Sequence, residues 1–202
     1  MRPLRWHAVW IGFLAGASAV ALLAGCGTVT SSARAAAVHH FIDESYAYYA
    51  GSLSELVALP ATTDIVEGSV AGVAGRGLQA GASPADQPYP YTDFDITVTR
   101  WLKGSGASSI VIHQIGGTGA DGSQWLVDGD PLLSVGSENV FFLHLYAPGK
   151  YFIVAGPTGR FPVINGEVTA MSQGTARDGV PESVPAFVQR VKALVASSSA
   201  AS

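Results

Sequence analysis

Residues 117–122, GTGADG, place three glycines in the spacing Gly-x-Gly-x-x-Gly, which lets a backbone approach a dinucleotide phosphate. This chemistry needs a helix directly after the glycines, because the amides at a helix N-terminus bind the pyrophosphate. The next residues, SQWLVDGDP, show no helical periodicity. We therefore interpret residues 117–122 as a loop and not as a dinucleotide site.

Acidic residues cluster in the same region and in one predicted strand. Asp121, Asp128 and Asp130 would suit calcium by residue type, but their spacing departs from the calcium-loop pattern and no suitably placed glutamate follows. Turn formation explains the Asp-Gly pairs without a metal. Asp93 and Asp95 share one face of a strand, and we expect them to be solvated rather than an acid–base pair.

The histidines do not form a recognisable metal site. His113 and His144 each fall within a predicted strand, and a register shift of one residue would reverse the face of either side chain. Two strand histidines can bind zinc, but no third ligand stands nearby, and His39-His40 adjoin a predicted tether. No Gly-x-Ser-x-Gly turn is present. We predict no catalytic residue, no metal and no cofactor.

The only cysteine, Cys26, closes a three-part N-terminal segment. Residues 1–7 carry two arginines and no acid, residues 8–23 are apolar, and Leu-Ala-Gly stands directly before the cysteine. This order is typical of a secretory signal, and the apolar run is short for a permanent membrane span. Leu-Ala-Gly-Cys resembles the lipobox of bacterial lipoproteins.

The lipobox resemblance implies that the sulfur of Cys26 receives a diacylglyceryl group and that residues 1–25 are a signal peptide removed by cleavage. Two acyl chains anchor stably, because each buried CH₂ contributes about 0.8 kcal/mol. The implied location is the outer face of the cytoplasmic membrane, with the membrane as a partner through this lipid. A free or buried Cys26 in an uncleaved chain is the alternative.

The chain after residue 25 is acidic. It has 177 residues, with nine Lys and Arg against fifteen Asp and Glu, a formal net charge of −6. This charge argues against nucleic acid as a partner and against a polybasic second anchor. The length suffices for one well-buried domain.

A tether and a short helix are expected before the β-rich part. Residues 26–50 begin with small polar residues after Cys26 and are predicted to be the lipidated cysteine and a flexible tether. HHFIDESYAYYAG, within residues 39–51, is compatible with a short helix or with extended chain. In the next stretch Ser52 and Glu55 have capping-box spacing and Pro60 ends the predicted helix.

From Thr63 onward, runs of β-branched and aromatic residues separated by Gly, Pro, Asn and Asp predict strands. A loop is expected at residues 77–91, a hairpin turn at residues 147–150, and an edge strand at Pro162. In YTDFDITVTRWL, alternation directs the apolar residues inward and Asp93 outward. We expect burial of Phe94, Ile96, Val98, Val111, Phe142 and Leu143.

A final helix is predicted with Ser183 as N-cap and Pro185 in its first turn. Only two cations, Arg190 and Lys192, lie on it, so we expect it to dock on the β domain rather than on a membrane. Residues 196–202 are expected to be a frayed tail. The apolar stripe that would dock comprises Phe187, Val188, Val191, Leu194 and Val195.

The pattern predicts a mainly β fold, a small OB-like barrel or sandwich of five to six strands with a short helix before it and an amphipathic helix after it. We assign residues 51–172 to the short helix and β domain, and residues 173–202 to the C-terminal helix and tail. The order of these sequence stretches along the chain resembles that in OB-like domains of uncharacterised secreted bacterial proteins. The matching stretches are residues 64–70, 98–104, 111–117 and 142–143.

Aromatic side chains are the candidate ligand-binding residues, because rings give a large contact area at low entropy cost. Tyr89 and Tyr91 fall in a Pro-rich stretch, and Trp101 and Trp125 flank the middle strands. The alternative is that these rings close the open ends of a barrel.

The predicted function is a non-catalytic, lipid-anchored binding or interaction module of the cell envelope, with a protein, glycan or small ligand as partner. One alternative is a protease-inhibitor-like module, since OB-like metalloprotease inhibitors have this general shape. Those inhibitors bind zinc through a free N-terminal cysteine, which a lipidated Cys26 would not provide. The other alternative is an enzyme with a dispersed site.

Overall fold

The computed structural model describes residues 38–42, 46–81, 87–171 and 174–200, all within one unit of the chain, residues 36–202. The predicted signal peptide and Cys26 lie outside the described residues. Within the described residues the chain is mainly β, with two α-helices and one 3₁₀-helix. The prediction of a mainly β fold with one helix before the sheet and one after it is therefore confirmed.

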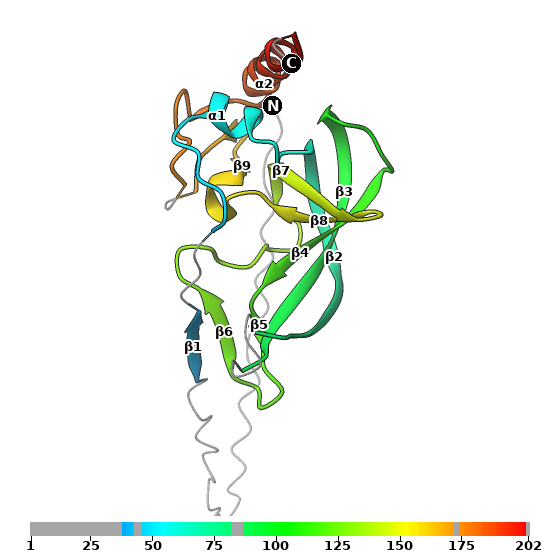
Figure 1. Cartoon of the computed structure of the whole chain (residues 1–202), viewed down its shortest axis with the longest axis vertical. Helices are drawn as coiled ribbons and strands as arrows, with labels where there is room; N and C mark the ends of the chain where they lie inside the picture. Colours follow the sequence, from blue (N-terminus) through cyan, green and yellow to red (C-terminus); the bar gives the residue numbers. More distant parts are fainter. Residues whose placement is uncertain (1–37, 43–45, 82–86, 172–173, 201–202) are drawn as a thin grey trace, which may run out of the picture. The chain divides into compact units, whose positions relative to one another are not determined.

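Eight strands form the large sheet, in the order β11-β10-β9-β7-β2-β3-β4-β8, and β8 also pairs with β7. Every pair is antiparallel except β4 with β8. Pairing therefore runs in a circuit through β2, β3, β4, β8 and β7, and β9 to β11 extend the sheet from β7 (Figure 1). The bounds are β2 (Asp64–Gln79), β3 (Tyr89–Lys103), β4 (Ser109–Ile115), β7 (Glu138–Ala147), β8 (Lys150–Ile153), β9 (Arg160–Ile164), β10 (Glu167–Val168) and β11 (Glu182–Ser183).

A second, three-stranded sheet has the order β1-β6-β5, with β1 (His39–Ile42) parallel to β6 (Gln124–Val127). Residues 39–42, which fall within the range predicted as a tether, are therefore extended. The GTGADG segment forms β5 (Gly117–Thr118) and the turn to β6. No helix follows the glycines directly, and residues 117–122 are a short strand and a turn rather than a loop throughout.

The first helix, α1 (Leu53–Ala58), begins as its sequence predicts. The Ser52 hydroxyl accepts from the Glu55 amide at 3.2 Å, and the Glu55 carboxylate accepts from the Gly51 amide at 2.7 Å. Asp178 accepts from the Leu53 amide at 2.7 Å, so a residue far along the chain satisfies another orphan donor of this helix. Leu59 is the C-cap, directly before Pro60.

Two apolar clusters lie on opposite sides of β2 and β7. One contains Ile65 and Phe142 together with α1 and α2, and the other contains Val66 and Phe141. Consecutive residues of these strands are buried because successive side chains point to opposite faces and each face meets a core. The second cluster also includes Phe94, Ile96, Ile110, Ile112, Leu143 and Tyr151.

The final helix, α2 (Val184–Ala200), packs on this unit as predicted. Phe187, Val188 and Val191 are buried, and the Phe187 ring lies 5.0 Å from that of Phe161. α1 and α2 lie together at one end of the large sheet, opposite β1, β5 and β6 (Figure 1). The tail prediction is wrong, because the helix continues to Ala200.

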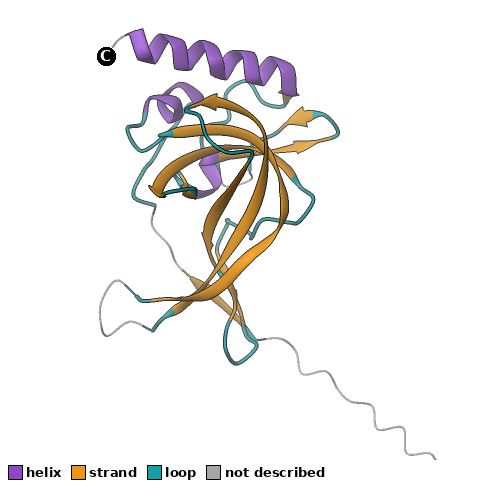
Figure 2. Ribbon diagram, turned by 90° about the vertical axis from the view of Figure 1, so that its right-hand side faces the viewer, coloured by secondary structure: helices purple, strands orange, loops and turns teal. Residues whose placement is uncertain are grey.

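Several strand predictions need correction. Five to six strands were expected, whereas the described residues form a sheet of eight and a sheet of three. The expected loop at residues 77–91 is shorter, because β2 extends to Gln79 and β3 begins at Tyr89 (Figure 2). Pro162 is not on an edge, since β9 pairs with both β7 and β10. The hairpin turn at residues 147–150 is confirmed.

The expected core is largely confirmed. Phe94, Ile96, Phe142 and Leu143 are buried. Val98 and Val111 are only partly buried. For Val111 the reason is that the inward positions of β4 are those of the neighbouring isoleucines. Asp93, expected to be solvated, is 9% exposed and therefore belongs to the interior.

Candidate functional site

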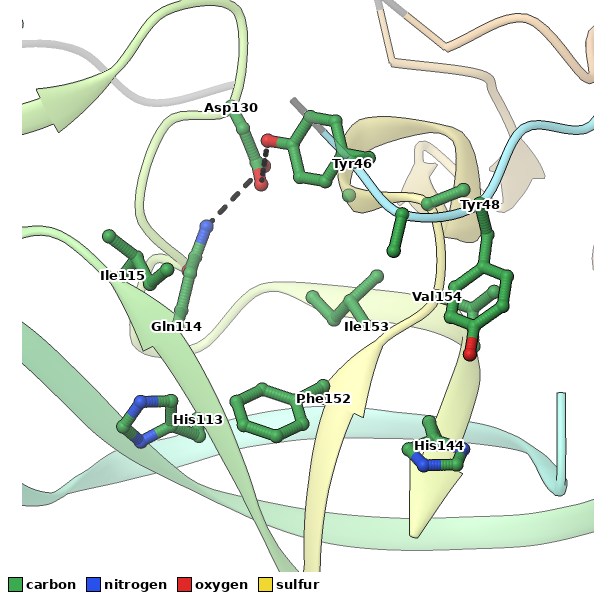
Figure 3. A pocket seen from close by; sticks show the side chains of 13 residues that line it. Tyr46, Tyr48, His113, Gln114, Ile115, Asp130, His144, Phe152, Ile153 and Val154 are labelled. Carbon is green, nitrogen blue, oxygen red and sulfur yellow. Dashed lines mark hydrogen bonds between the residues drawn. The ribbon is translucent and has the colours of Figure 1, made fainter. Parts of the chain in front are cut away.

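A pocket of about 230 Å³ opens where β4, β8 and the segment before α1 meet. Its walls are mostly apolar and include Tyr48, Ile115, Phe152 and Ile153 (Figure 3). His144 on β7 also lines it, and its Nδ1 lies 3.0 Å from the Ala61 carbonyl oxygen. An apolar concavity with a few polar groups is the usual form of a small-ligand site.

The polar end of the pocket is built around Asp130. The Tyr46 hydroxyl donates to Asp130 Oδ2 at 3.1 Å, and Gln114 Nε2 donates to Oδ1 at 3.4 Å (Figure 3). Arg160 Nη2 lies 3.1 Å from Oδ1, and both charged side chains are almost completely buried. Contacts with Asp130 therefore bring together Gln114 of β4, Arg160 of β9 and the segment before α1, which carries Tyr46.

Burial raises the pKa of the Asp130 carboxyl, and this effect outweighs the opposing attraction of Arg160 and the hydrogen bonds from Tyr46 and Gln114. Burial likewise lowers the pKa of Arg160. The carboxyl therefore holds its proton to a higher pH than a solvated aspartic acid.

The Tyr46 ring is seated against the backbone of Gly156, which has a φ of 50°. A Cβ at this position would overlap the ring, so a residue without a side chain is required both by the close approach and by the left-handed backbone. This contact brings the segment before α1 into the wall of the pocket.

A row of aromatic rings adjoins the pocket and crosses from β3 to β7. The rings of Tyr91 and His113 have centroids 4.5 Å apart, His113 and Phe152 meet edge to face at 5.2 Å, and Phe152 stacks on Tyr146 at 4.2 Å. His113 and Phe152 belong to both the row and the pocket. Tyr146 is 41% exposed, so one end of the row is open to solvent.

His113 is held by two polar partners. Its Nδ1 donates to Asp93 Oδ1 at 2.6 Å, and its Nε2 lies 3.0 Å from Gln79 Oε1. Asp93 and His113 are register partners on β3 and β4, which explains why an aspartate at an expected solvent position is buried. No hydrogen bond from a serine, threonine or cysteine to either ring nitrogen occurs among the described residues.

The four predicted aromatic residues do not come together. Tyr91 belongs to the row, and the Tyr89 hydroxyl accepts from Gln79 Nε2 at 3.4 Å. Trp101 meets Tyr151 at 6.4 Å, and Trp125 stacks on His40 in the small sheet. Tyr91 thus adjoins the pocket through His113, whereas the predicted ligand-binding residues did not include Tyr46, Gln114, Asp130, Tyr146 or Phe152. Tyr91, His113 and Phe152 come together because β4 pairs with both β3 and β8 in a particular register. The residue pattern does not specify that register, so the sequence alone could not have grouped them.

Asp121 is not part of the pocket lining, although Asp130, which was considered with it for calcium, is. Asp121 accepts from the Ser123 amide and hydroxyl, which lowers the pKa of its carboxyl. No group of three or more His, Cys, Asp or Glu side chains suited to a metal ion occurs among the described residues. Over the same residues, no helix is both long and apolar enough to cross a membrane.

Comparison with protein-family models finds no match, and a search of curated proteins finds no significant relative.

Proposed function

We propose that this protein is a lipid-anchored, extracytoplasmic binding module whose ligand site is the pocket at Asp130 together with the adjoining aromatic row. The anchor is Cys26, and the location is the outer face of the cytoplasmic membrane. The observation that carries the binding function is the pocket itself, with apolar walls and a polar end at Asp130, Tyr46 and Gln114.

An OB-like barrel is part of this proposal. The pairing circuit through β2, β3, β4, β8 and β7, with one parallel pair between β4 and β8, supports it. OB-folds bind ligands on the face of their second and third strands and on nearby loops. In this circuit β3 and β4 hold those positions, and they carry Tyr91 and His113.

The ligand we propose is a small apolar ring with one polar substituent. The ring would contact Phe152, Ile153 and Ile115, and the substituent would reach the polar groups at Asp130. The volume of about 230 Å³ suits a compound of this size and excludes a folded partner from the interior of the pocket.

Ligand-observed NMR with p-cresol tests this function, on the chain carrying Cys26→Ser so that no lipid is attached. We expect saturation transfer from the protein to p-cresol. Ala47→Trp should abolish it, because Ala47 lines the pocket and an indole would fill it. Ala193→Trp on the exposed face of α2 is the matched control and should leave the signal unchanged. Equal signals from both variants would contradict the proposed site.

A further inference from the structure

A second pocket lies on the far side of the Asp130–Arg160 pair. Asp130 lines the pocket described above, whereas Arg160 lines this second one, of about 170 Å³. Its polar lining comes from Arg160, Asn139, Ser134 and Ser137. Its apolar lining consists of Pro131, Leu132, Leu133, Pro162 and Met171.

Arg160 is 3% exposed, yet its buried Nε has no hydrogen-bond partner among the described residues. Its hydrogen bond to the Pro131 carbonyl at 2.9 Å and its ion pair with Asp130 at 3.1 Å both use Nη2. Buried donors are almost always paired in native proteins, so the unpaired Nε of this guanidinium points to an acceptor from outside the chain.

The other polar side chains of this pocket can also donate. Asn139 is 3% exposed and donates to the Ser137 hydroxyl at 3.2 Å, which leaves the hydroxyl proton of Ser137 free to turn toward an acceptor. Ser134 supplies another hydroxyl at the exposed rim. A group that accepts several hydrogen bonds fits this set.

Charge sets the kind of acceptor. Arg160 carries a single positive charge and meets Asp130 through Nη2, so its unpaired Nε side suits a group with at most one negative charge, and a dianion would be poorly compensated in a buried setting. A carboxylate has one negative charge and several acceptor sites, and the leucine, proline and methionine side chains suit a short carbon chain. We propose that this pocket binds a carboxylate with a short apolar chain, with Arg160, Ser134 and Ser137 as its donors.

The proposal is tested by calorimetric titration of the full chain in nonionic detergent with butyrate and with its neutral isostere butyramide. Butyrate should bind and butyramide should bind at least about tenfold more weakly, because hydrogen bonds to a charged group are stronger than neutral ones. Titration with N-acetyl-alanyl-valine distinguishes a peptide C-terminus from a free acid as the source of the carboxylate, since the natural source should bind more tightly.

Three variants complete the test. Ser137→Leu fills the pocket without altering Arg160 and should remove butyrate binding, and Arg160→Lys should weaken it because the planar donor set is lost. Arg100→Lys is the control, since Arg100 pairs with Glu67 away from this pocket, and should bind as the parent does. If Arg160→Lys fails to fold, butyrate binding by the Ser137→Leu variant still tests the proposal. No butyrate binding by the parent, equal binding of butyramide, or unchanged binding by Ser137→Leu would overturn the proposal.

Discussion

At the scale of single residues, the buried polar groups are the ones whose replacement should affect stability and the proposed sites most. Asp93, His113, Asp130 and Arg160 are each at most 9% exposed. Such groups remain buried only when hydrogen bonds and charges compensate the loss of water. Each therefore depends on a partner from another part of the chain, and removing the partner should be costly.

Asp93→Ala should lower the free energy of unfolding by about 1–3 kcal/mol, because it leaves His113 Nδ1 buried without an acceptor. Asp95→Ala is the matched control two residues along the same strand, where the side chain is only partly buried. Urea denaturation of both variants measures the difference. Equal losses of stability would mean that the Asp93–His113 bond contributes nothing beyond an ordinary strand position.

Asp130 should make stability depend on pH in an unusual direction. Its pKa is raised by burial, so the folded state binds the proton more tightly than the unfolded chain does. Its contribution is fully present below the pKa of the unfolded chain, about 3.9, and is lost as the pH rises through the folded pKa. Relative to Asp130→Asn, the parent should therefore gain stability as the pH falls through this window. Parallel denaturation curves for the two proteins at every pH would contradict this linkage.

At the scale of helices and strands, the local sequence was sufficient to predict an element where its structure depends mainly on its own residues. Ser52, Glu55 and Pro60 predict α1, and the apolar stripe of α2 predicts its docking. The position of Asp93 was predicted wrongly because its burial depends on which β4 residue lies opposite, and alternation within β3 carries no such information. Consecutive residues of β7 are apolar, so the sequence could not show which of these side chains point to which face of the sheet. In the structure both faces of β7 pack against a core.

The docking of α2 gives a direct test at this scale. Phe187→Ala should lower the free energy of unfolding by about 3–5 kcal/mol, because the ring is completely buried against Phe161. Gln189→Ala, on the exposed face of the same helix, should change it by less than about 0.5 kcal/mol. Chemical denaturation of the two variants checks this. Similar midpoints would show that the helix contributes little to the core.

At the scale of the whole molecule, one ion pair separates the two pockets. Arg160 on β9 and Asp130 in the loop after β6 meet between them, and Tyr46 joins the pair from the segment before α1. Asp130 was weighed from the sequence as a calcium ligand, but nothing linked it to Tyr46 and Arg160, because the three residues are far apart in the chain and share no motif. Their meeting is a product of the tertiary fold, and both proposed sites depend on it.

Cys26, the predicted site of the lipid anchor, lies in the part of the chain before the described residues. Cys26→Ser should prevent lipidation, because a serine hydroxyl does not replace the thiolate that receives the diacylglyceryl group. Metabolic labelling with a fatty-acid analogue should mark the parent and not the variant, and the variant should no longer sediment with membranes. Ala24→Ser, a small-residue change beside the same cysteine, is the control and should still be labelled. A labelled, membrane-bound Cys26→Ser protein would remove the anchor from the proposed function, while p-cresol binding would still test the pocket independently.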